Sequence, residues 1–194
     1  MSAVLTQTHY TAEEYLTLER NASCKSEFHD GQIYAMTSSN RNHNLINGNI
    51  VAELSLQLKK RPCEAYGSDM RVKAAEARSY HYPDIVVVCG TPQFEDAYVD
   101  TLLNPTLLIE VLSPSTEAYD RGGKFAHYRK IPTLREYLLV TQDQPSIERY
   151  VRQGDVWILT EAVGLEASVP LESIDCALSL REVYDKVLDG VDNI

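Results

Sequence analysis

The stretch Thr106-Leu-Leu-Ile-Glu-Val-Leu112, together with the run Asp84-Ile-Val-Val-Val-Cys89 that precedes it, decides which fold this chain is expected to adopt. Both runs are almost continuously apolar, which is typical of strands that are buried on both faces of a sheet. Such strands need other elements on either side to cover them. The two runs therefore predict the centre of a sheet that is flanked by helices.

Helical patterns lie on both sides of these runs. Ile46, Ile50, Leu54 and Leu58 recur every four residues, which predicts a long amphipathic helix over residues 40–60, ended by Pro62. Shorter helices are expected over residues 11–20, where Thr11 and Glu14 have the spacing of a capping box, over residues 116–129, and after Ser179, with Glu182 three residues on.

Further strands complete the expected sheet. Asp30-Gly31 suits a tight hairpin between strands at residues 25–29 and 32–37, because glycine tolerates positive φ. Other strands are expected at residues 63–67, 69–73 and 136–140, and in a hairpin over residues 146–160 that turns near Gly154. The predicted class is α/β (α+β), a mixed β-sheet flanked by α-helices, in one domain over residues 1–194 without linkers or repeats.

Composition limits the classes of protein that fit. The chain has 194 residues, 44% of them hydrophobic, which is enough to bury one sizeable core. It begins without a signal-like segment and contains no run of about 20 apolar residues, so a cytoplasmic protein without a membrane partner is expected. The four cysteines, at positions 24, 63, 89 and 176, form no CxxC pair and are expected to be reduced and without zinc.

Glu110 is the most informative residue, because it interrupts an apolar strand. Burying an ionised carboxylate is costly unless a cation, a partner or a change of protonation offsets the cost. An Arg or Lys reaching in from a helix is one explanation. A bound metal ion is the other.

Asp84 favours the explanation that Glu110 binds a metal ion. It follows Pro83 and opens a valine-rich strand, so that by itself it is also consistent with an ordinary turn. Two carboxylates at neighbouring strand ends repel one another unless a hard cation lies between them. Asp84 and Glu110 are therefore predicted to hold Mg²⁺ or Mn²⁺.

The motifs around this pair resemble those of the Uma family of restriction-endonuclease-like proteins, within the PD-(D/E)xK nuclease superfamily. The resemblance rests on Tyr82-Pro83-Asp84, on the strand with Glu110, on Ser113-Pro114-Ser115-Thr116, and on Asp120, Lys124 and Tyr128 downstream. It extends to residues 10–15, to Glu27 before Asp30-Gly31, to His43 and to Glu136-Tyr137-Leu138, and so covers most of the chain. It implies a restriction endonuclease-like fold and a site in which the Val111 carbonyl joins Asp84 and Glu110 as a metal ligand.

The chain departs from the superfamily pattern at Leu112, where a lysine is usual two residues after the acidic residue. The resemblance places the lysine on the following helix instead, as Lys124, whose long side chain could reach the same place. The alternative is a surface ion pair, because Asp120 and Lys124 have the favoured i, i+4 spacing with the acid first. Asp120 is kept as an additional site member.

Glu27 and His43 are weaker members of the predicted site. The resemblance suggests that Glu27 is a second-metal or water-mediated ligand, although it could be solvent-facing. His43, near the start of the long helix, could be an ordinary capping or surface residue. Ser113 and Ser115 are expected to cap a helix, because no histidine is placed to activate either hydroxyl.

These residues predict a metal-dependent endonuclease that hydrolyses phosphodiester bonds in nucleic acid, with DNA the expected substrate and a homodimer the expected assembly, since a duplex has two strands to cut. Two alternatives stay open. The net charge of −10, with 28 acidic against 18 basic residues, and Leu112 would suit a non-catalytic binding or assembly module on the same fold. A phosphoesterase acting on small nucleotides would need no basic surface.

Overall fold

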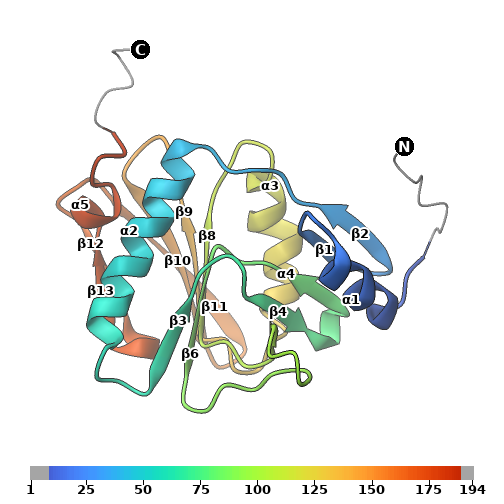
Figure 1. Cartoon of the computed structure of the whole chain (residues 1–194). Coiled ribbons are helices and arrows are strands. Elements are labelled where there is room, and N and C mark those ends of the chain that lie inside the picture. Colours follow the sequence, from blue (N-terminus) through green and yellow to red (C-terminus); the bar gives the residue numbers. More distant parts are fainter. Residues whose placement is uncertain (1–8, 189–194) are drawn as a thin grey trace.

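The computed structural model describes residues 9–188, which form helices packed around two main β-sheets and a small third one (Figure 1). The larger sheet has six strands in the order β11-β10-β9-β8-β6-β3. Its strands are β3 (Cys63–Tyr66), β6 (Ile85–Cys89), β8 (Leu107–Val111), β9 (Glu136–Val140), β10 (Ser146–Gln153) and β11 (Val156–Val163). Only β8 and β9 run parallel, so the sheet is mixed, as predicted.

The two apolar runs lie side by side in the middle of this sheet. Strand β6 pairs antiparallel with β8, with Ile85 opposite Ile109. All five residues of β8 are buried, as are the first four of β6. The prediction that these runs form the centre of a covered sheet is confirmed.

Helix α2 (Arg41–Leu58) covers one face of the six-stranded sheet, and Asn40 caps its first turn. Ile46, Ile50, Leu54 and Leu58 are buried and share a core with alternate residues of the sheet, among them Ile85 and Ile109. The same core includes residues of β12 (Ser168–Leu171), β13 (Cys176–Ser179) and α5 (Leu180–Val183). The four-residue apolar repeat therefore identified the helix correctly. Helix α5 begins after Ser179 as expected, but the Ser179 side chain makes no capping hydrogen bond.

The opposite face is covered by the helical segment after β8, which is not a regular α-helix. It consists of α3 (Glu117–Tyr119), a π-helical turn η2 (Asp120–Lys124) and α4 (Phe125–Tyr128). The turn contains Gly122 and Gly123, and a Cβ atom on Gly123 would lie 2.7 Å from the ring of Tyr119. Glycine is needed there because the Tyr119 ring packs directly on the backbone.

The sequence predicted a single mixed sheet, but five of the strands form a second sheet in the order β2-β1-β5-β4-β7. Its strands are β1 (Ser26–His29), β2 (Gln32–Ala35), β4 (Arg71–Ala74), β5 (Ser79–His81) and β7 (Thr101–Leu102). Helix α1 (Ala12–Asn21) packs on it and has the predicted capping box at Thr11. The β1–β2 turn places Asp30 at φ 48° and Gly31 at φ 81°, as the hairpin prediction required.

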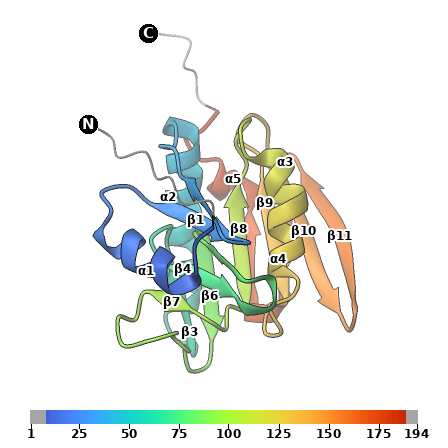
Figure 2. The ribbon, with the colours of Figure 1, turned by 90° about the vertical axis from the view of Figure 1, so that its right-hand side faces the viewer.

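In Figure 1, α3 and α4 lie between the six-stranded sheet and the β1–β2 hairpin, and in Figure 2 they lie beside that hairpin. Phe125 packs on Tyr137 of the sheet and Tyr119 on His29 of the hairpin. The helical segment therefore faces residues of both sheets. Within residues 9–188, no helix has the length and apolar character that crossing a membrane requires.

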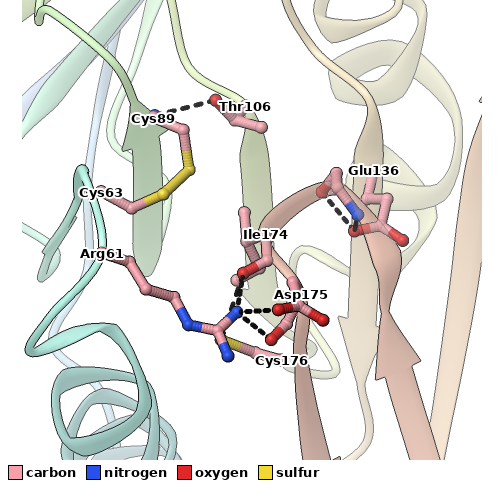
Figure 3. The surroundings of a disulfide bond; sticks show 9 residues. Arg61, Cys63, Cys89, Thr106, Glu136, Ile174, Asp175 and Cys176 are labelled. Carbon is pink, nitrogen blue, oxygen red and sulfur yellow. Dashed lines mark hydrogen bonds and ion pairs between the residues drawn. A yellow bond between two sulfur atoms is a disulfide. The ribbon is translucent and has the colours of Figure 1, made fainter.

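A disulfide joins Cys63 and Cys89, so the prediction that all four cysteines are reduced is wrong for this pair (Figure 3). The two residues are directly opposite each other in the antiparallel β3–β6 pair, with Cα atoms 4.0 Å apart. Cys24 and Cys176 are free. The spacing of 26 residues did not reveal the pair, because the pairing depends on the register between two strands.

Near the disulfide, Arg61 donates to the carbonyl of Ile174 and pairs with the carboxylate of Asp175.

Candidate active site

Lys124 lies at the centre of a buried group of carboxylates, between the two main sheets. Its Nζ is 2.9 Å from Oε1 of Glu110 on β8 and 3.0 Å from Oε1 of Glu27 on β1. It is also 3.7 Å from Oδ1 of Asp120, at the start of the π-helical turn. Lys124 is only 6% exposed, so the alternative of a surface Asp120–Lys124 ion pair does not describe this structure.

Lys124 reaches Glu110 from the helical segment, whereas Leu112, two residues after Glu110, is apolar. Leu112 is buried in the apolar cluster that also contains Leu108 and Tyr128. Residues two apart on a strand point to the same face, so Leu112 and Glu110 both face the helical segment. From that segment, the side chain of Lys124 extends back to Glu110.

Asp84 immediately precedes β6, next to the end of β8. Continuing the register Ile85↔Ile109 by one residue places Asp84 opposite Glu110. Oδ2 of Asp84 accepts a hydrogen bond from the backbone N–H of Val111 at 2.8 Å and lies 3.1 Å from Nε2 of His43. The structure thus brings His43, from the first turn of α2, to the predicted carboxylate pair.

Glu110 is 3% exposed and is held by two donors on one oxygen. The hydroxyl of Tyr128, on α4, donates to Oε1 at 2.9 Å, and Lys124 approaches the same atom. Burial raises the pKa of Glu110 well above its ordinary value. Lys124 opposes this shift, and the neighbouring charges of Asp120 and Asp84 add to it. A carboxyl group in this setting gains from any additional positive charge.

Glu27 is buried rather than solvent-facing, and it anchors Lys124. Its Oε1 accepts from the backbone N–H of Tyr82 at 3.1 Å and its Oε2 lies 3.1 Å from Nδ1 of His81. Burial opposes ionisation of this carboxyl group, but Lys124 and His81 outweigh it and lower the pKa of Glu27 below its usual range. Glu27 is therefore a stable negative partner for the ammonium.

The charge on Lys124 is maintained by its neighbours. Burial disfavours the ammonium, but Glu110, Glu27 and Asp120 together raise the pKa of Lys124 well above its ordinary value. Burial also raises the pKa of Asp120, against the effect of Lys124. These carboxylates favour the charged form of Lys124, in which it donates hydrogen bonds.

The donor atoms present suit a hard divalent cation held by few protein ligands. Asp84 and Glu110 supply carboxylate oxygens, and the peptide between Val111 and Leu112 supplies a carbonyl at the same strand end. Across residues 9–188, no group of three or more His, Cys, Asp or Glu side chains is arranged to hold a metal ion. Mg²⁺ commonly binds through one or two carboxylates and takes its other ligands from water and substrate phosphate. The pair therefore fits Mg²⁺ or Mn²⁺ better than a metal that needs a complete protein cage.

Sequence reasoning did not assign roles to three residues that complete this site. Tyr128 orients Glu110, while His81 contacts Glu27 and, through Nε2, lies 3.0 Å from Nδ1 of His127. The signals were present but weak. His81 comes three residues before Asp84, and His127 comes three residues after Lys124, on the same side of the helical segment.

The fold and the site together define a restriction endonuclease-like, and hence nuclease-like, protein. The family model Uma2, described as "Putative restriction endonuclease", matches residues 12–181, and the chain belongs to this family. The family resemblance of the motifs is therefore confirmed.

Similar proteins agree in length and fold. The chain is 41% identical to the uncharacterized protein sll1609 of Synechocystis sp. over 87% of this chain and 96% of that protein. It is 36% identical to the uncharacterized protein slr1290 of the same organism, over 89% and 90% respectively. A crystal structure described as "a putative nuclease belonging to DUF820", from Anabaena variabilis, superposes with a TM-score of 0.76 at 22% identity, over 92% of this chain and 99% of that one. At this identity the superposition shows a shared fold.

Proposed function

We propose that this chain is a metal-dependent endonuclease that hydrolyses phosphodiester bonds in nucleic acid, with DNA as the expected substrate. Asp84 and Glu110, with the Val111 carbonyl, would hold Mg²⁺ or Mn²⁺. Lys124 replaces the lysine that the superfamily usually carries at the position of Leu112. Since a duplex has two strands to cut, two copies of the chain would act together.

One observation carries the proposal, namely the buried contact of 2.9 Å between Nζ of Lys124 and Oε1 of Glu110. A lysine that only compensated a structural carboxylate would not need three acidic neighbours and a second carboxylate opposite the first. The proposal is supported by the residue types, because Asp84 and Glu110 can hold a divalent cation and Lys124 can stabilise the charge of a phosphodiester transition state.

The residues of the candidate active site have distinct tasks in this mechanism. Lys124, held by Glu27, directs its N–H donors at the attacking water and at the phosphate oxygens, which gain negative charge in the transition state. Tyr128 fixes the orientation of Glu110, and the Val111 N–H with His43 fixes that of Asp84. When bound, the divalent cation would make water more acidic and offset the charge of the phosphate.

A cleavage assay tests the proposal. Supercoiled plasmid and a single-stranded oligonucleotide would be incubated with Mg²⁺ or Mn²⁺, with EDTA as the metal-free condition. Asp84→Asn and Glu110→Gln should each lower cleavage by about 100-fold or more, with circular dichroism showing that both variants remain folded at the assay temperature. Glu117→Gln is the matched control, because Glu117 is exposed and pairs with Arg121 on the helix surface. Undiminished cutting by both site variants would rule out the assigned residues.

A non-catalytic binding or assembly module is the second candidate, and two observations favour it. The net charge is −10, and Leu112 stands where the superfamily usually carries a lysine. Calorimetric titration with Mn²⁺ separates the candidates. Heat of binding that disappears in Asp84→Asn supports the enzyme, whereas no binding together with no cleavage of any nucleic acid supports the module.

A further inference from the structure

Three aromatic side chains form a stack next to the buried carboxylates. The rings of His29 and Tyr34 have centroids 4.2 Å apart and lie nearly parallel, at 9°. On the helical side, the ring of Tyr119 stacks with His29 at 5.7 Å and 26°. We call His29, Tyr34 and Tyr119 the aromatic platform.

The platform is continuous with the candidate active site. In the β1–β2 pair, Tyr34 is directly opposite Glu27, so both side chains lie on the same face of the sheet. His29 is two residues after Glu27 on β1 and therefore shares that face. Because Glu27 binds Lys124, one residue separates the platform from the ammonium.

The platform retains surface that can contact a ligand. Tyr34 is 46% exposed, and its strand β2 lies at the edge of the five-stranded sheet. The hydroxyl of Tyr119 is buried and makes no hydrogen bond with the part of the chain that the structure describes. A half-exposed ring that is already stacked on His29 suits a flat ligand, and the buried Tyr119 hydroxyl belongs to the interior side of the platform.

Charge favours a nucleobase over a phosphate at this place. The protein carries −10 overall, and Lys124 is already shared among three carboxylates. Stacking between a base and an aromatic ring needs no net charge and supplies much of the affinity in proteins that bind single strands.

We propose that the aromatic platform stacks an unpaired nucleobase of a single-stranded or locally unpaired nucleic acid, which positions the adjoining phosphodiester at Lys124. The proposal rests on the proposed nuclease function for the identity of the ligand, and it specifies the substrate class. Duplex DNA keeps its bases stacked on each other, and a base must leave the helix before it can reach such a ring.

Binding measured without cleavage tests this inference. A short fluorescein-labelled oligodeoxythymidylate would be titrated with the full chain in EDTA, with fluorescence anisotropy as the readout. Tyr34→Ala should raise the Kd about 5- to 100-fold, whereas Tyr34→Phe, which keeps the ring, should stay close to the parent protein. Tyr98→Ala is the matched control, because Tyr98 is 71% exposed and stacks under Arg20, outside the platform. A duplex of the same sequence should bind more weakly than the single strand.

The outcomes separate this inference from the enzyme itself. If the chain cuts nucleic acid but Tyr34→Ala binds the single strand as tightly as the parent protein, the platform is wrong and the nuclease stands. If Tyr34→Ala and Tyr98→Ala weaken binding equally, or if the parent protein binds no single strand or prefers duplex, the platform is also wrong. If Tyr34→Ala alone loses binding while no cleavage is found, the proposal of base stacking on the platform is supported and the proposal of nuclease activity is rejected.

Discussion

The ammonium of Lys124 and the carboxylate of Glu110 are 2.9 Å apart, and both side chains are almost completely buried. Sequence offered two explanations for Glu110, a helix-borne cation or a metal ion. The structure contains the first, since Lys124 and Tyr128 both contact Oε1 of Glu110, while Asp84, opposite Glu110, is the second carboxylate that a cation would need. The same lysine can therefore support the fold and take part in chemistry.

Replacing Lys124 by Met should destabilise the protein. Removal of the ammonium leaves Glu27, Glu110 and Asp120 facing each other in a buried space, which typically costs about 3–5 kcal/mol. Urea denaturation would measure the change in the free energy of unfolding. Lys130→Met, at an exposed position in the turn that follows α4, should change it by less than about 0.5 kcal/mol. Equal stabilities for the two variants would mean that the buried contact is energetically unimportant.

Removing one hydroxyl group should also be measurable. Tyr128→Phe keeps the buried ring and deletes only the hydrogen bond to Glu110, so a loss of about 1–2 kcal/mol is expected. Thermal or urea unfolding would record it, with Tyr98→Phe as an exposed control. A Tyr128→Phe protein as stable as the parent would show that Lys124 alone satisfies Glu110.

Stability should fall as the solution is acidified from pH 6.5 toward pH 4. Burial, with the nearby His81, His29 and Lys130 and against Asp30, lowers the pKa of His127 from 6.5 to about 4. Between these values the unfolded chain binds a proton that the folded protein does not, so the free energy of unfolding decreases as pH decreases.

Urea denaturation at a series of pH values would test this dependence. His127→Gln should show a shallower decline through the window, although part of it will remain because the pKa of His81 is also lowered by burial. Parallel curves for the variant and the parent protein would exclude His127 as a source of the pH dependence.

Reducing the Cys63–Cys89 disulfide should lower stability. The bond closes a loop with a sequence separation of 26, for which chain-entropy arguments give about 3 kcal/mol. Urea unfolding with and without dithiothreitol measures how much stability is lost on reduction. The stability of the double variant Cys63→Ala/Cys89→Ala should not depend on the reductant. Cys24→Ser, at an exposed free cysteine, should remain as sensitive to the reductant as the parent protein.

Local patterns predicted the local structure well. The repeat of Ile46 to Leu58 predicted α2, and the apolar run around Glu110 predicted a buried central strand, because both signals depend only on the periodicity of one segment. The Asp30-Gly31 hairpin succeeded for the same reason, since the turn is specified by its own two residues.

Features that depend on partners distant in sequence could not be obtained in this way. The disulfide required the β3–β6 register, and the separate five-stranded sheet required the short β5 strand between β1 and β4. The placement of Lys124 depends on the π-helical turn η2, which changes the direction in which the residues after it point around the helix axis. The i, i+4 spacing from Asp120 therefore did not produce a surface ion pair.

The π-helical turn η2 has an evolutionary consequence. A π-helical turn is commonly equivalent to one extra residue inserted in an α-helix, and it is frequent at functional sites. Each residue of an α-helix advances the chain by about 100° around the axis, so deleting Gly122 or Gly123 would rotate Lys124 away from Glu110. Relatives that lack this extra residue would need their lysine one place earlier or later to keep the same contact. The length of the segment between Thr116 and Tyr128, rather than the presence of a lysine alone, is therefore the feature by which an intact site can be recognised in a gene sequence.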